Sequence, residues 1–341
     1  MFVTRKLTTK VLIGWLGKHI LWLLAFYIVI AILYHYFDFP ISLPWLPVSV
    51  IGTAVAFFVG FKNNQAYDRL WEARKIWGSI INDSRTFGMR VSNFLRTEKR
   101  LSENEAASLR QKIIYRHIAW LYVHRNQLLQ RAQWEQISDK GLTGKYAKKY
   151  EQNFGLNIIA GDLSIDEVEP FLVSSELEAI SKYKNAATQI IHKQSEELIA
   201  LKDKGYIDSF EHVQLEELLK NFYTLQGQNE RIKKFPFPRD YSTMSRFFVM
   251  TFIFLFPFSL IPELMKMGCW AFWISIPVAT IIGLVYLIME DLGDYAENPF
   301  MGTPHAMPML SMCRTIEIDL REMLKETDLP PAIQPKDSVL M

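Results

Sequence analysis

Four hydrophobic stretches, arranged as two pairs around a long charged middle, constrain this chain more than any other feature. They cover residues 20–37, 45–61, 247–261 and 267–289. The hydrocarbon core of a bilayer is ~30 Å thick, so a spanning helix needs about 17–25 largely apolar residues. The first, second and fourth stretches reach that length. The third, over residues 247–261, reaches it only with Pro262 and Leu264 inside the span. The sequence therefore predicts an all-α membrane protein with four transmembrane helices per subunit.

Basic residues indicate the orientation of these helices. They gather before the first stretch, after the second and before the third, at Arg5, Lys6, Lys10, Lys18, Lys62, Arg69, Arg74, Lys75, Lys233, Lys234, Arg239 and Arg246. The connection over residues 38–44 has no Lys or Arg, and the other connection has one basic residue, Lys266. By the positive-inside rule, both termini and the middle are expected to be cytoplasmic. The net charge of +2 is too small to indicate nucleic-acid binding.

The chain divides into four segments by composition. Residues 1–61 hold an N-terminal segment and two spans, 62–241 a helical cytosolic domain, 242–289 two further spans, and 290–341 a cytosolic C-terminal segment. Apolar periodicity predicts that the second span continues into the cytoplasm, and that helices cover residues 105–130, 175–202, 209–231 and 309–324. Capping-box spacing marks helix starts at Asp208 with Glu211 and at Ser164 with Glu167. Glycines indicate a loop over residues 139–144.

The second stretch carries a row of three residues, Thr53, Phe57 and Phe61, at four-residue spacing on one helix face. We call this row the neck stripe. Small residues at positions 52, 56 and 60 run beside it and let membrane helices approach closely. If several copies surround an axis, the aromatic rings form a narrow apolar constriction, which can gate by dewetting. The alternative is a buried helix whose aromatic rings fill the core of one subunit.

Polar residues follow directly at the inner end of this helix. Lys62, Asn63 and Asn64 are candidates for the mouth of a wetted vestibule below the constriction. The alternative is an ordinary interfacial cap, which many membrane helices carry.

Other polar groups give weak support for chemistry. His117 and His124 lie seven residues apart on one predicted helix face and could hold a metal with a third ligand, but solvated surface histidines are favoured. The acidic cluster over residues 290–297 could bind a cation, but an interfacial group that pairs with Arg or Lys is favoured. The sequence has no phosphate-binding glycine loop, metalloprotease helix motif or nucleophile elbow. No enzyme activity, metal or cofactor is expected.

Three blocks of sequence resemble the bacterial branch of the bestrophin family. The most specific is GFKNNQAYDRLWEAR over residues 60–74. FP at 237–238, followed by Tyr241, Ser242, Arg246 and PF at 257–258, is similar to the segment that leads into the family's third span. ENPF at 297–300 and CRTIE at 313–317 are similar to its post-membrane segment.

The resemblance implies a homopentamer around a central ion pore, with a helical cytosolic domain that encloses a vestibule. The family neck is formed by three pore-facing residues on the second membrane helix, which correspond here to Thr53, Phe57 and Phe61. A second constriction at the cytosolic exit is assigned to Val213, with Phe210 as the neighbouring candidate. Animal members favour anions such as chloride, whereas bacterial members can favour monovalent cations.

Two departures from the family pattern concern its cytosolic parts. Animal members bind calcium with an acidic run after Asn-Pro-Phe, but residues 301–308 read MGTPHAMP here and carry no carboxylate. Calcium needs several oxygen ligands, so a calcium clasp is not expected. The stretch over residues 130–178 is longer than a compact bacterial member needs, and the sequence assigns it no role.

The sequence thus predicts a passive ion channel whose partners are copies of itself, membrane lipid and permeant ions. The hydroxyl of Thr53, the first residue of the neck stripe, can hydrate an ion where an aliphatic side chain cannot. We therefore expect the outer end of the constriction to be hydrated. The competing prediction is a membrane-anchored scaffold or signalling module without ion flux, in which the cytosolic part binds a partner.

Overall fold

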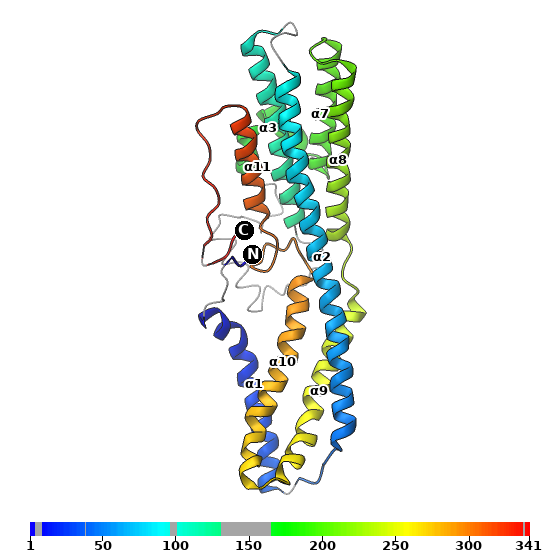
Figure 1. Cartoon of the computed structure of the whole chain (residues 1–341), viewed down its shortest axis with the longest axis vertical. Coiled ribbons are helices and arrows are strands. Elements are labelled where there is room, and N and C mark those ends of the chain that lie inside the picture. Colours follow the sequence, from blue (N-terminus) through cyan, green and yellow to red (C-terminus); the bar gives the residue numbers. More distant parts are fainter. Residues whose placement is uncertain (4–8, 38, 96–100, 131–164, 337) are drawn as a thin grey trace. The chain divides into compact units, whose positions relative to one another are not determined.

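The computed structural model describes residues 1–3, 9–37, 39–95, 101–130, 165–336 and 338–341 (Figure 1). Within these ranges the regular elements are helices, and the extended segments form only isolated bridges. The elements are α1 (Thr9–Tyr36), α2 (Trp45–Phe94), α3 (Glu103–Leu129), α5 (Ile165–Val168), η3 (Glu169–Phe171), α6 (Ser174–Ser181), α7 (Ala186–Asp203), α8 (Ser209–Lys234), α9 (Arg239–Met265), α10 (Cys269–Ala296) and α11 (Met309–Met323).

The chain forms two compact units. The membrane unit comprises Thr4–Leu70 and Phe237–Asn298, and the helical unit comprises Met1–Val3, Trp71–Pro236 and Pro299–Met341. The division expected from composition follows the ends of the apolar stretches, at residues 61 and 289. The membrane unit continues beyond both, because polar contacts between α2 and α10 extend past the last apolar turn, as described below.

Among the described residues, four helices are long and apolar enough to cross a membrane, in agreement with the predicted number of spans. The candidate segments are Leu16–Tyr36, Trp45–Phe94, Arg239–Met265 and Trp270–Ala296. The third span is longer than its apolar stretch, since α9 includes both Pro257 and Pro262 and ends at Met265. The second span continues without a break as α2, a helix of 50 residues. The predicted helical continuation of that span is therefore present.

Close approach of the helices in the membrane unit depends on glycine. A Cβ added at Gly52 of α2 would lie 2.7 Å from the ring of Phe252 on α9. One added at Gly283 of α10 would lie 2.9 Å from the hydroxyl of Tyr27 on α1. At Gly60, by contrast, a Cβ would meet nothing within 4 Å. The small-residue row of α2 therefore packs against its own chain at Gly52 and is open at Gly60.

α3 is the centre of the helical unit. Most of its residues from Ile113 onward are buried. Gln194 of α7 donates a hydrogen bond to the Ile113 carbonyl at 3.1 Å, and Trp120 Nε1 donates to Gln226 Oε1 of α8 at 3.0 Å. Because a buried polar group without a partner is costly, these side chains fix how the neighbouring helices dock on α3.

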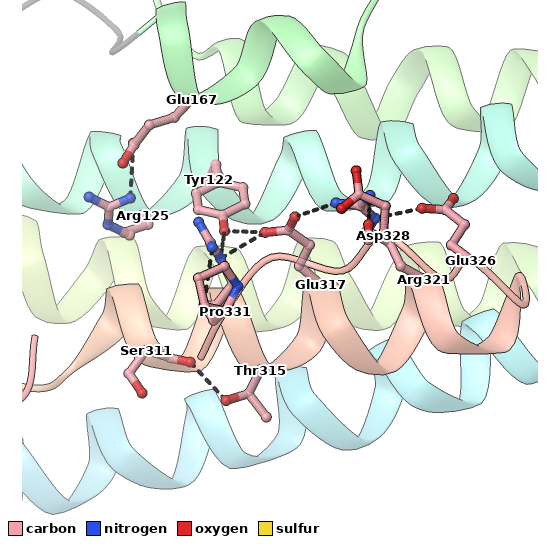
Figure 2. Close-up of polar contacts among 11 residues, drawn as sticks. Tyr122, Arg125, Glu167, Ser311, Thr315, Glu317, Arg321, Glu326, Asp328 and Pro331 are labelled. Carbon is pink, nitrogen blue, oxygen red and sulfur yellow. Dashed lines mark hydrogen bonds and ion pairs between the residues drawn. The ribbon is translucent and has the colours of Figure 1, made fainter. Parts of the chain in front are cut away.

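Polar contacts also attach α11 to α3 (Figure 2). The Tyr122 hydroxyl of α3 donates to Glu317 at 2.5 Å, and Arg314 Nε donates to the same hydroxyl at 3.3 Å. Arg321 contacts the other oxygen of Glu317 at 3.2 Å. Burial, followed by the nearby Glu317 charge, raises the pKa of Tyr122. The CRTIE block that resembles the bestrophin family thus supplies Arg314 and Glu317 to a structural contact.

Several helix boundaries differ from the sequence prediction. The helix expected over residues 175–202 is two helices, α6 and α7, because Asn185 caps a new helix by accepting a hydrogen bond from the Thr188 amide at 3.2 Å. α3 begins earlier than expected, with a capping box between Ser102 and Glu105. The expected loop at 139–144, the cap at Ser164 and most of the stretch over 130–178 lie outside the described residues.

The predicted capping box at the start of α8 is confirmed. Asp208 accepts a hydrogen bond from the Glu211 amide at 2.8 Å, and Glu211 accepts one from the Asp208 amide at 2.9 Å. We expect Asp208→Ala to destabilise this helix end by about 1 kcal/mol, because an orphan amide loses its acceptor. Asp208→Asn keeps an acceptor and is the matched control. Amide hydrogen exchange over the first turn of α8 measures the effect, and equal exchange in both variants would contradict it.

Candidate pore-lining site

The neck stripe lies on an exposed face of α2 in the membrane unit. Phe57 and Phe61 are 66% and 60% exposed. Together with Thr53, Ala56, Gly60 and Asn64 they line an open groove of about 420 Å³. The rings therefore do not fill the core of one subunit, and the alternative considered from the sequence does not agree with the structure. The exposed rings are accessible to a lipid tail, to water or to a second copy of the chain.

Thr53 uses its hydroxyl proton inside its own helix. Its Oγ1 donates a hydrogen bond to the Ser49 carbonyl at 3.0 Å. A threonine hydroxyl within a helix commonly bonds to the carbonyl four residues before it. The oxygen still has acceptor capacity toward the groove. The stripe is consequently polar at Thr53 and aromatic at Phe57 and Phe61.

The opposite face of α2 fixes the direction of the stripe. Val55 and Val59 are buried in the core of the membrane unit. The Tyr286 hydroxyl of α10 donates to the Gly52 carbonyl at 2.9 Å, and Phe58 stacks on Tyr241 of α9 with ring centroids 4.5 Å apart. Because this face of α2 packs against α9 and α10, Phe57 and Phe61 on the other face point outward.

Lys62 is buried in the membrane unit, whereas the sequence predicted a solvated position. Its side chain is 1% exposed, and Nζ contacts Glu290 Oε1 and Asp294 Oδ1, both at 2.6 Å. Ser245 of α9 donates to the second oxygen of Glu290 at 2.5 Å. The expected position at a vestibule mouth is therefore corrected: in this subunit the Lys62 ammonium points back into the helix packing, where a buried carboxylate compensates its charge.

The two asparagines that follow Lys62 differ from each other. Asn63 is half-buried and donates to the Met289 carbonyl at 2.8 Å, and a Cβ at Gly293 would collide with it. Asn64 is exposed and lines the groove with Phe61. Of the three residues expected at the vestibule mouth, only Asn64 shares the face of the neck stripe.

The acidic cluster at the end of α10 is an ion-pair network. Besides the contacts of Lys62, Asp291 meets His19 Nε2 at 2.9 Å, and Glu297 lies 3.7 Å from Arg239. Across the described residues, no group of three or more His, Cys, Asp or Glu side chains is placed to hold a metal. The favoured interpretation, an interfacial charge group, agrees with these contacts. Periodicity could not have found the pairs of His19 and Lys62, since their partners on α10 lie more than 200 residues away.

The residues proposed for the cytosolic aperture lie at the start of α8 in the helical unit. Phe210 is 82% exposed and Val213 is 64% exposed. Their apolar side chains are therefore not part of the hydrophobic core of the helical unit.

The two histidines of α3 are core residues, contrary to the expectation that they are solvated. His117 contacts the Ser84 hydroxyl at 2.9 Å, and His124 contacts Asn229 Nδ2 at 3.1 Å and stacks on Trp120. Burial lowers the pKa of His117 to about 3 and that of His124 to about 4. They are neutral structural side chains at neutral pH.

Their burial predicts acid sensitivity of the helical unit. Because the pKa values are lower in the folded protein, the unfolded chain binds protons first, and stability falls as pH drops from ~6.5 toward ~4. Each histidine contributes about 1.4 kcal/mol per pH unit in that window. We expect His124→Phe to reduce the loss of melting temperature between pH 7 and pH 5. His192→Gln is the control, since His192 is 61% exposed, and should leave the loss unchanged. Identical losses in all three proteins would contradict the assignment.

The spans and the exposed aromatic groove define a class: a multi-pass helical membrane protein with a structured non-membrane part. Residues 3–322 match the bacterial and fungal bestrophin proteins, and the chain belongs to that family.

Several known proteins are similar to this chain. It is 24% identical to the voltage-dependent anion channel-forming protein YneE of Escherichia coli, over 85% of this chain and 80% of that one. It is also 24% identical to a voltage-dependent anion channel-forming protein of Nostoc sp., over 95% and 91%. A crystal structure of a bacterial bestrophin homolog from Klebsiella pneumoniae shares the fold, with a TM-score of 0.73, 21% identity and coverage of 91% and 99%.

Proposed function

We propose that this protein is a passive channel for small monovalent ions in a bacterial inner membrane, with both termini in the cytoplasm. The observation that carries the proposal is the neck stripe, an exposed row of one threonine and two phenylalanines along a groove on a membrane helix. A channel for anions is supported by the names of the Escherichia coli and Nostoc relatives, and chloride is the anion that the family resemblance implies.

The channel is proposed to be a homopentamer. A single subunit leaves the groove open, and an ion path needs walls on all sides. Five copies around one axis would bring the rings of Phe57 and Phe61 together as two apolar rungs, with Thr53 above them. An apolar constriction of this kind opens and closes by wetting and dewetting. Val213, with Phe210 as the second candidate, is proposed as a further constriction at the cytosolic exit.

The alternative is a membrane-anchored scaffold without flux. The purified protein in a planar bilayer under a chloride gradient separates the two. A channel gives single-channel currents whose reversal potential reports the permeant ion, whereas a scaffold gives none. Mass measurement of the detergent-solubilised protein tests the pentamer independently.

Calcium is proposed to have no role in opening. Residues 301–308 offer no carboxylate for a clasp, and calcium sites take several oxygen ligands. Open probability should be the same in micromolar calcium and in chelator. Activation by calcium would contradict this part of the proposal.

A further inference from the structure

We propose that Asp68 is a specificity-determining residue of the pore, whose carboxylate opposes anions and favours cations at the inner end of the neck. The inference rests on the proposed channel function and adds a residue and a direction to it. It is carried by the charges of α2 in the membrane unit and by the helical position of Asp68.

Asp68 continues the neck stripe. It follows Phe57 by eleven residues and Phe61 by seven, so at 3.6 residues per turn it lies within about 20° of both around the helix axis. With a rise of 1.5 Å per residue it sits about 10 Å beyond Phe61. Asn64, which lines the groove, lies between them along the same face. An ion that leaves the aromatic rungs on the inner side therefore passes Asn64 and then Asp68.

Among the described residues of the membrane unit, Asp68 is also the charge along α2 that has no compensating partner. The charged residues of this part of α2 are Lys62, Asp68 and Arg69. Lys62 is buried in its ion pairs with Glu290 and Asp294. Arg69 is half-buried and donates to the Glu297 carbonyl at 3.1 Å. Asp68 is exposed, and within the described residues it makes no hydrogen bond or ion pair.

The physical consequence follows from symmetry. In a pentamer one carboxylate per subunit becomes a ring of five on the ion path. A charge at several ångströms still acts through water, because the Debye length is about 10 Å at 0.1 M salt. Such a ring raises the local concentration of cations and lowers that of anions, the role that acidic rings have in cation channels.

The test is the reversal potential of Asp68→Asn under a tenfold gradient of sodium chloride. We expect the chloride-to-sodium permeability ratio to rise by about threefold or more relative to the unaltered channel. Asp68→Lys should raise it further. The shift should be larger at low salt than near 1 M, where the Debye length is only about 3 Å. A size-only effect of the side chain would not depend on salt in this way.

Asp240→Asn is the matched control. It removes the same charge from an exposed position on α9, a helix that supplies no residue to the groove of the neck stripe, and should leave the ratio unchanged. Asp68→Glu should also preserve it. Normal currents with an unaltered reversal potential in Asp68→Asn and Asp68→Lys would overturn the role of Asp68 and leave the channel intact. Absence of current in the unaltered protein would instead overturn the channel function itself.

Discussion

Lys62→Met is expected to destabilise the membrane unit by about 3–5 kcal/mol, the usual cost when one partner of a buried ion pair is removed. Glu290 is 1% exposed and contacts both Lys62 and Ser245. Without the ammonium, the Glu290 carboxylate stays in the helix packing with the Ser245 hydroxyl as its remaining donor, and this uncompensated charge weakens the packing of α2 on α10. Thermal unfolding of the solubilised protein measures the loss.

A double variant shows whether the loss of stability in Lys62→Met comes from the unpaired Glu290 carboxylate or from the lysine side chain itself. Lys62→Met with Glu290→Gln removes both charges while the amide can still bond to Ser245, so it should recover much of the stability lost in Lys62→Met. Lys266→Met is the matched control, because Lys266 is 70% exposed and pairs with Glu263 at the surface. That change should cost less than about 1 kcal/mol. Equal melting temperatures for Lys62→Met and Lys266→Met would contradict the buried pair.

The membrane helices were predictable because their signal is local. Apolar length alone gives four spans, and a four-residue spacing gives the neck stripe. The exposure of Phe57 and Phe61 agrees with that face. The same reasoning expected the side chain of Lys62, the residue after Phe61, to be solvated. Its actual partners lie on α10, more than 200 residues away, and no single-sequence pattern specifies such a contact.

The helical unit shows the same limit in its core. The seven-residue spacing of His117 and His124 correctly put them on one helix, but their polarity indicated solvent. In the structure Trp120, Phe222 and the neighbouring helices enclose them. α3 is covered by α7, α8 and α11 together, and coverage from several sides is a property of the assembled unit. The capping boxes depend only on residues three apart. The Asp208 box was predictable for that reason, and the Ser102 box of α3 carried the same signal and was missed.

Phe57→Ala and Phe61→Ala are expected to raise the current through the channel. Each substitution removes an aromatic ring from a rung of the proposed neck, which widens it and lowers the free energy of wetting. A barrier that falls by only about 1.4 kcal/mol raises a rate about tenfold, so an increase of that order in conductance or open probability is expected. Phe254→Ala is the control, since Phe254 is an exposed ring of α9 and is absent from the groove. The double variant Phe57→Ala with Phe61→Ala should exceed either single one if the two rungs act in series. Unchanged currents in both single variants would remove these rings from the gate, whereas an increase in Phe254→Ala of the same size would show that the effect arises from loosened packing and not from the neck.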